Sequence, residues 1–169
     1  RQHEGALVVV VGGDLAAEAL RRGLELEFEQ CERVMRRQAL LDRGLSPERP
    51  VMALSGNAVE HAVLMLACYT AGIPIAPISV AYSLQSQDHA KLKHIAELLA
   101  PGLIYVADTA PFAKALAALD LAGVEIAAGR NGGNRDGVTS FEQLAASRPG
   151  AALERASAAI GADTIAKVL

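Results

Sequence analysis

The chain has 169 residues, 51% of them hydrophobic and 21% charged, which is typical of one globular domain with a sizeable core. Its net charge of -3 argues against a nucleic-acid partner, because binding to a phosphate backbone needs a concentrated positive surface. The densest basic stretch, Arg33, Arg36 and Arg37, lies among acidic residues and is interpreted as a solvated helix face.

The two cysteines, Cys31 and Cys68, fall in apolar helical patterns and do not form a CxxC pair. Free buried thiols in a cytoplasmic protein are therefore the expectation, with no disulfide framework. The apolar run at residues 6–11 is too short to cross a bilayer and lacks the pattern of a signal peptide. We expect no membrane partner.

The first part of the chain predicts one strand and one long helical region. Residues 7–11 form a short apolar run followed by turn residues. From Asp14 a helical pattern extends, with an interruption near Gly23, until Gly44 stops it.

A regular strand–helix alternation follows. Strands are predicted at residues 51–54, 73–78, 103–107 and 124–128. Helices between them have start signals in Asn57 with Glu60 (a capping box), in Asp88, and in Thr109 with Pro111, and stop signals in Gly72 and in Pro101 with Gly102. This alternation predicts an α/β fold, a mostly parallel sheet flanked by helices with right-handed crossovers.

Two stretches interrupt the alternation. Residues 129–137 read as a turn-rich surface loop, and residues 145–161 as an irregular tail with a small Ala-rich helix. Residues 164–169 read as the opening of another strand.

Two glycine-containing turns are candidate phosphate sites. Gly12 and Gly13, followed by Asp14, come after a strand, but a dinucleotide site needs three spaced glycines at a helix N-terminus. The loop at residues 131–137 lacks the Lys and Ser/Thr donors of a phosphate loop. A plain turn is the favoured interpretation of both.

Asp108 ends a predicted strand, where α/β sheets place ligands and phosphoacceptors. A receiver-like domain would need a pair of acids after the first strand and a Lys after the last, and the sequence supplies at most Asp14. Helix capping or a solvent-facing strand end is the favoured role of Asp108.

Candidate metal and nucleophile groups are weak. Asp88, His89 and His94 suggest a metal cluster, but five residues of helix separate the two histidines by about 140° around the axis. His61 reads as a surface or capping residue, and Ser55 lacks the GxSxG context of a nucleophile elbow. No catalytic or metal-binding residue is assigned, and cofactor-binding residues stay unknown.

Residues 40–108 carry a family resemblance. The phrases LSGNAVEHA (54–62), GIPIAPISVAYSL (72–84) and SQDHAKLKHI (86–95) resemble the N-terminal region of adenylate-forming acyl-CoA synthetases (AMP-binding enzymes), closest to feruloyl-CoA synthase. The ending GADTIAKVL (161–169) resembles the strand before that family's phosphate loop. The resemblance extends over residues 26–169, is weaker between Gly123 and Gly161, and fails over the first 25 residues. Val80 stands where the family would have a proline.

The resemblance implies that residues 26–169 are the N-terminal α/β subdomain of an AMP-binding domain, truncated before the phosphate loop, behind a divergent segment at residues 1–25. The parent protein would be an acid–thiol ligase that uses ATP, Mg²⁺ and coenzyme A to activate a small carboxylate, such as ferulate or a related aromatic acid. The isolated chain is expected to bind none of these cofactors and to be inactive. The alternative is a non-enzymatic α/β module, receiver-like or ligand-binding. The oligomeric state is left open.

Overall fold

A computed structural model describes residues 8–10, 38–132, 137–145 and 151–169. The strands are β1 (Val8–Val10), β2 (Val51–Leu54), β3 (Ile75–Pro77), β4 (Leu103–Asp108), β5 (Glu125–Arg130), β6 (Val138–Ser140) and β7 (Ile165–Val168). The helices are α2 (Gln38–Asp42), α3 (Val59–Ala71), α4 (Val80–Leu84), α5 (Ala90–Leu99), α6 (Thr109–Ala117), α7 (Phe141–Ala145) and α8 (Ala151–Ala158). Over these ranges, no helix combines the length and the apolar character that a bilayer crossing requires.

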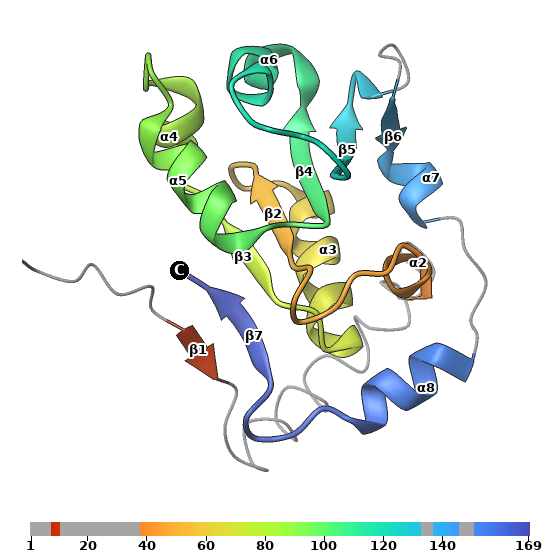
Figure 1. The fold of residues 1–169 in the computed structure, drawn as a ribbon. Coiled ribbons are helices and arrows are strands. Elements are labelled where there is room, and N and C mark those ends of the chain that lie inside the picture. The colour runs from red at the N-terminus through yellow and green to blue at the C-terminus, as the bar shows by residue number, and fades with distance from the viewer. Residues whose placement is uncertain (1–7, 11–37, 133–136, 146–150) are drawn as a thin grey trace, which may run out of the picture.

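The strands form one sheet in the order β1-β7-β3-β2-β4-β5-β6 (Figure 1). All neighbouring pairs are parallel except β1 with β7, which run antiparallel. β2 lies between β3 and β4, with Met52 opposite Ala76 on one side and Ile104 on the other. The predicted α/β class, a mostly parallel sheet flanked by helices, is confirmed.

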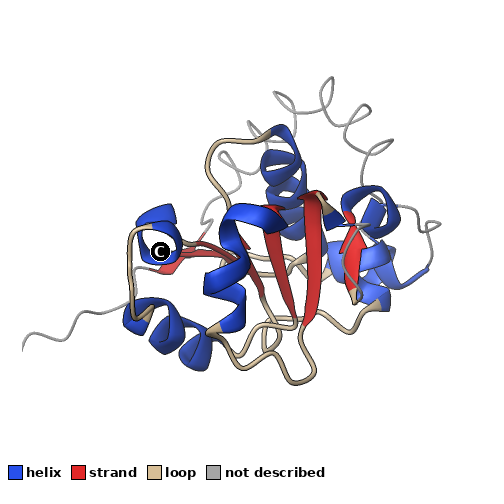
Figure 2. Cartoon of the chain, turned by 90° about the horizontal axis from the view of Figure 1, so that it is seen from above, coloured by secondary structure: helices blue, strands red, loops and turns tan. Residues whose placement is uncertain are grey.

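The central strands are buried on both faces, as continuous apolar runs in parallel sheets require. Alternate residues point to opposite sides, so that Val51 and Ala53 join one hydrophobic cluster while Met52 and Leu54 join the other. The first cluster includes residues of α2, α3 and α7, and the second includes residues of α5 and α6. Figure 2 shows helices on both sides of the strands. The sheet is therefore the middle layer of three.

The helix ends largely follow the predicted signals. Gly72 has φ +68 and ends α3, where its N–H donates to the carbonyls of Cys68 and Tyr69. Gly44, also at positive φ, follows the last turn of α2. The Asp88 carboxylate accepts a hydrogen bond from the N–H of Ala90, the first residue of α5, at 3.1 Å.

The predicted capping box of Asn57 and Glu60 is wrong. α3 begins at Val59, so the N-cap is Ala58, which has an extended backbone and no side chain able to accept a hydrogen bond. Asn57 lies one residue too early to serve as the cap. The first turn of α3 is therefore left without a side-chain cap.

Several short elements were not predicted. α4 follows β3, and β6 and α7 occupy residues 138–145, where the sequence indicated no regular structure. β5 also continues through Arg130, two residues into the predicted loop. The tail helix and the last predicted strand are present as α8 and β7. The helical pattern from Asp14 lies outside the described residues until Gln38.

Candidate functional site at the carboxyl edge of the sheet

The most informative position in the sheet lies between β2 and β4. From β2 the chain passes through α3, on one face of the sheet, to β3; from β4 it passes through α6, on the opposite face, to β5. The chain thus leaves two neighbouring parallel strands toward opposite faces, which defines a topological switch point (Figure 1). In open α/β sheets, ligands bind outside the carboxyl ends of the strands at this point. Residues after β2 and β4 therefore form the candidate site.

Asp108, the last residue of β4, is the N-cap of α6. Its Oδ1 accepts hydrogen bonds from the N–H of Ala110 at 2.9 Å and from Nδ2 of Asn131 at 2.7 Å. Its Oδ2 lies 3.9 Å from Nε of Arg130. The hydrogen bond from Asn131, then that from Ala110, and the charge of Arg130 hold the pKa of Asp108 below its ordinary value. The favoured capping role of Asp108 is confirmed.

This network predicts a pH dependence of stability. Because the folded pKa is lower than the unfolded value of about 3.9, the carboxylate stabilises the fold above about pH 4. That contribution is lost as the pH falls through the folded pKa. In acid unfolding experiments, Asp108→Asn should therefore lose less stability than the wild type between about pH 5 and about pH 2. In an Asn131→Ala background, which removes the largest cause of the shift, the difference should shrink; an unchanged difference would contradict this account.

Ser55, in the loop after β2, and His61, in the first turn of α3, lie at the same edge. The Ser55 hydroxyl donates to the carbonyl of Gly56 at 2.9 Å, and Nδ1 of His61 lies 3.3 Å from the same carbonyl oxygen. Ser55 therefore makes its hydrogen bond to backbone and forms no nucleophile–base pair with His61. The ring of His61 lies beside Tyr105 of β4, with centroids 6.5 Å apart.

The two histidines near Asp88, His89 and His94, do not point toward a common metal site. His89 has φ +53 at the start of α5, is 7% exposed, and places Nδ1 3.3 Å from the carbonyl oxygen of Tyr82. His94 is exposed on α5, one and a half turns later. Among the residues that the structure describes, no group of three or more His, Cys, Asp or Glu side chains is arranged to hold a metal ion.

The remaining sequence candidates are distributed as follows. Asn131 is described, at φ +58, and Gly137 at φ +81, but residues 133–136 of the glycine-rich loop lie outside the described residues. Cys68 is buried and free, and burial raises the pKa of its thiol. Outside the described residues lie Gly12, Gly13, Asp14, Cys31, Arg33, Arg36 and Arg37.

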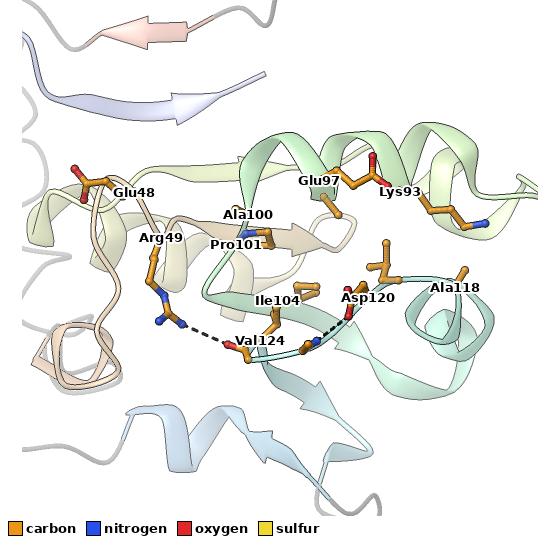
Figure 3. A pocket seen from close by; sticks show the side chains of 14 residues that line it. Glu48, Arg49, Lys93, Glu97, Ala100, Pro101, Ile104, Ala118, Asp120 and Val124 are labelled. Atoms are coloured by element: carbon orange, nitrogen blue, oxygen red, sulfur yellow. Dashed lines mark hydrogen bonds between the residues drawn. The ribbon is translucent and has the colours of Figure 1, made fainter.

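A pocket of about 680 Å³ lies at the opposite, amino edge of the sheet (Figure 3). It is lined by basic and acidic side chains, among them Lys93 of α5 and Glu97, together with apolar side chains such as Ile104. Two of its polar side chains form hydrogen bonds with backbone groups. Arg49 donates to the carbonyl of Gly123 at 3.4 Å, and Asp120 accepts from the N–H of Ala122 at 3.1 Å. These hydrogen bonds stabilise the turn before β5. Because the lining carries both acidic and basic side chains, its charge does not indicate a particular class of ligand.

No family model and no curated protein matches this sequence. Solved structures do match. A protein from Rhodopseudomonas palustris named as a long-chain-fatty-acid CoA ligase is 22% identical, with a TM-score of 0.55, over 72% of this chain and 29% of that protein. The apo structure of MatB, from the same organism, is 21% identical, with a TM-score of 0.52, over 100% of this chain and 30% of that protein.

The fold is one that occurs within these larger proteins. The chain spans about 30% of their length, so the similarity concerns one part of each. At this level of identity, the shared property is the arrangement of strands and helices, and it agrees with the fold that the family resemblance implied.

Sequence reasoning missed the partners of Asp108 and the environment of Tyr105. Asn131 follows the neighbouring strand β5 and is 23 residues away in sequence, so no local spacing links the two side chains. The pairing could have been suspected only because Asp108 and Asn131 both follow the carboxyl ends of consecutive predicted strands. Tyr105 lies in mid-strand and reads only as a core residue.

Proposed function

We propose that this chain is the N-terminal part of an ATP-dependent acid–CoA ligase. The observation that carries the proposal is the coincidence of two independent likenesses. The phrases at residues 54–62, 72–84 and 86–95 resemble adenylate-forming acyl-CoA synthetases, and the fold occurs within a protein named as a CoA ligase. The whole activity belongs to the longer protein that would contain this chain.

The proposed reaction has two steps. A carboxylate attacks the α-phosphate of ATP, which forms an acyl-adenylate and releases pyrophosphate; the thiol of coenzyme A then attacks the acyl carbon, which forms the thioester and releases AMP. The first step needs Mg²⁺ and hydrogen-bond donors around the phosphates, because negative charge builds up on the departing pyrophosphate.

The described residues do not supply that environment. The carboxylate of Asp108, at the end of β4, already has its oxygens engaged by Ala110, Asn131 and Arg130. We therefore assign no Mg²⁺, ATP or coenzyme A ligand to this chain. Its proposed role is structural: it forms part of the α/β domain of the parent enzyme and contributes no ligand to the reacting groups.

For the substrate we propose ferulate or a related aromatic acid, on the strength of the longer phrases that resemble feruloyl-CoA synthase. We also propose a cytoplasmic location, because coenzyme A and ATP are available there and Cys68 is a free thiol. A receiver-like role is less favoured, since phosphorylation of Asp108 would require its carboxylate to leave three partners.

The test uses the longer protein and the 169-residue chain side by side. With ATP, Mg²⁺, coenzyme A and ferulate, the longer protein should form feruloyl-CoA and AMP, detected by chromatography, while the isolated chain should form neither. Activity with a straight-chain fatty acid but not with ferulate would refute the substrate proposal and leave the ligase proposal standing. Labelling of Asp108 by acetyl phosphate would instead favour the receiver-like alternative.

A further inference from the structure

Two polar atoms are enclosed at the switch point without a hydrogen-bond partner among the described residues. They are the hydroxyl oxygen of Tyr105 and Nε2 of His61. Tyr105 is 0% exposed, and its ring packs edge-on against Phe141, with centroids 5.9 Å apart. A buried polar atom left unpaired costs about 1–3 kcal/mol, so the two atoms call for a physical explanation.

The neighbours of His61 fix which of its nitrogens carries the proton. The carbonyl of Gly56 can only accept a hydrogen bond, and it lies 3.3 Å from Nδ1. Nδ1 is therefore the protonated nitrogen of the neutral ring, which leaves Nε2 as an acceptor. The hydroxyl of Tyr105 is able to donate and to accept.

The two rings are neighbours, and neither atom has a direct hydrogen bond to the other. The ring centroids are 6.5 Å apart, and the planes are tilted by 46°. Buried polar atoms without a protein partner are commonly satisfied by an ordered water, which needs two to four polar partners.

The sequence around Tyr105 keeps its hydroxyl in place and neutral. A Cβ at Gly129 would lie 2.8 Å from the hydroxyl oxygen, so the glycine leaves the space that this atom occupies. Burial, and next the negative charge of Glu60, raise the pKa of Tyr105, so the hydroxyl keeps its proton near neutral pH.

We propose that Tyr105 and His61 form a binding site for a single water molecule, which accepts a hydrogen bond from the tyrosine hydroxyl and donates one to Nε2 of His61. The water joins β4 to the first turn of α3, the helix that lacks a side-chain cap. It fixes the loop after β2 at the switch point. The inference does not depend on the proposed ligase activity.

A double-mutant cycle on the 169-residue chain tests the site. Tyr105→Phe keeps the ring and removes the hydroxyl, and it should lower the folding equilibrium constant roughly fivefold in urea denaturation. In a His61→Ala background, the same change should have little effect. Tyr69→Phe, a half-buried tyrosine of α3 outside the site, is the matched control. A Tyr105→Phe variant as stable as the wild type, or more so, would show an unpaired hydroxyl and overturn the proposal, as would an equal loss in both backgrounds.

Nuclear magnetic resonance provides a readout that does not depend on stability. Long-range ¹H–¹⁵N spectra of the neutral His61 ring should show the proton on Nδ1, and the Tyr105 hydroxyl proton should be observable, with a cross-peak to a long-lived water. A proton on Nε2, or a hydroxyl proton without a water cross-peak, would contradict the proposed site.

Discussion

Leu64→Ala is expected to lower the free energy of unfolding by about 2–5 kcal/mol, the range measured for leucine truncation in well-packed cores. Leu64 is 0% exposed and belongs to the cluster between α3 and the sheet, which also contains Val51 and Tyr105. The loss has two parts, the hydrophobic transfer free energy of the deleted carbons and the cavity that remains because the sheet cannot collapse into it.

Leu98→Ala is the matched control for this measurement. Leu98 is 72% exposed on α5, so the same truncation removes little buried surface, and the free energy of unfolding should change by less than about 0.5 kcal/mol. Equal effects of the two substitutions in urea denaturation would mean that α3 does not pack on the sheet as described.

Gly129→Ala is expected to lower the free energy of unfolding by about 1–3 kcal/mol through overpacking. The added Cβ would lie 2.8 Å from the Tyr105 hydroxyl oxygen and 3.1 Å from the carbonyl oxygen of Ala107. The second contact is with backbone of β4, which is paired on both sides and cannot move away easily.

Two variants show whether crowding is the cause. At Gly56 an added Cβ would meet nothing within 4 Å, so Gly56→Ala should be neutral or slightly stabilising. Tyr105→Phe should relieve part of the Gly129→Ala loss, because it removes the nearer of the two atoms. A Gly129→Ala variant with wild-type stability would contradict the packing at this edge.

The sheet could be predicted because its central strands are buried on both faces. Such strands are continuous apolar runs, and Val51–Leu54 and Leu103–Asp108 stand out between turn and capping residues. The apolar faces of the helices were equally readable: Leu92 of α5 and Phe112 of α6 are buried as their spacing indicates.

The elements that could not be predicted are short. α4 and α7 have five residues each, less than two turns, so no repeating apolar face can develop in their sequences. β6 has three residues. The predicted capping box was wrong by one residue, because the position of the N-cap depends on where the four-residue loop from β2 enters the helix.

Only part of the candidate site could be predicted from the sequence. The position of Asp108 at a strand end was visible, and helix capping was one of the two roles favoured for it. Its pairing with Asn131, and the approach of Tyr105 to His61, join segments more than 20 residues apart through the strand order. That order is set by crossovers, which local patterns do not encode.

We propose that this fold serves an enzyme that makes acyl-adenylates. The most direct measurement is acid-dependent exchange of labelled pyrophosphate into ATP by the longer protein containing this chain, with Mg²⁺ present and coenzyme A absent. We expect exchange that requires a carboxylic acid and is strongest with ferulate or a related aromatic acid. A folded protein that gives no exchange with any aromatic or aliphatic acid would contradict it.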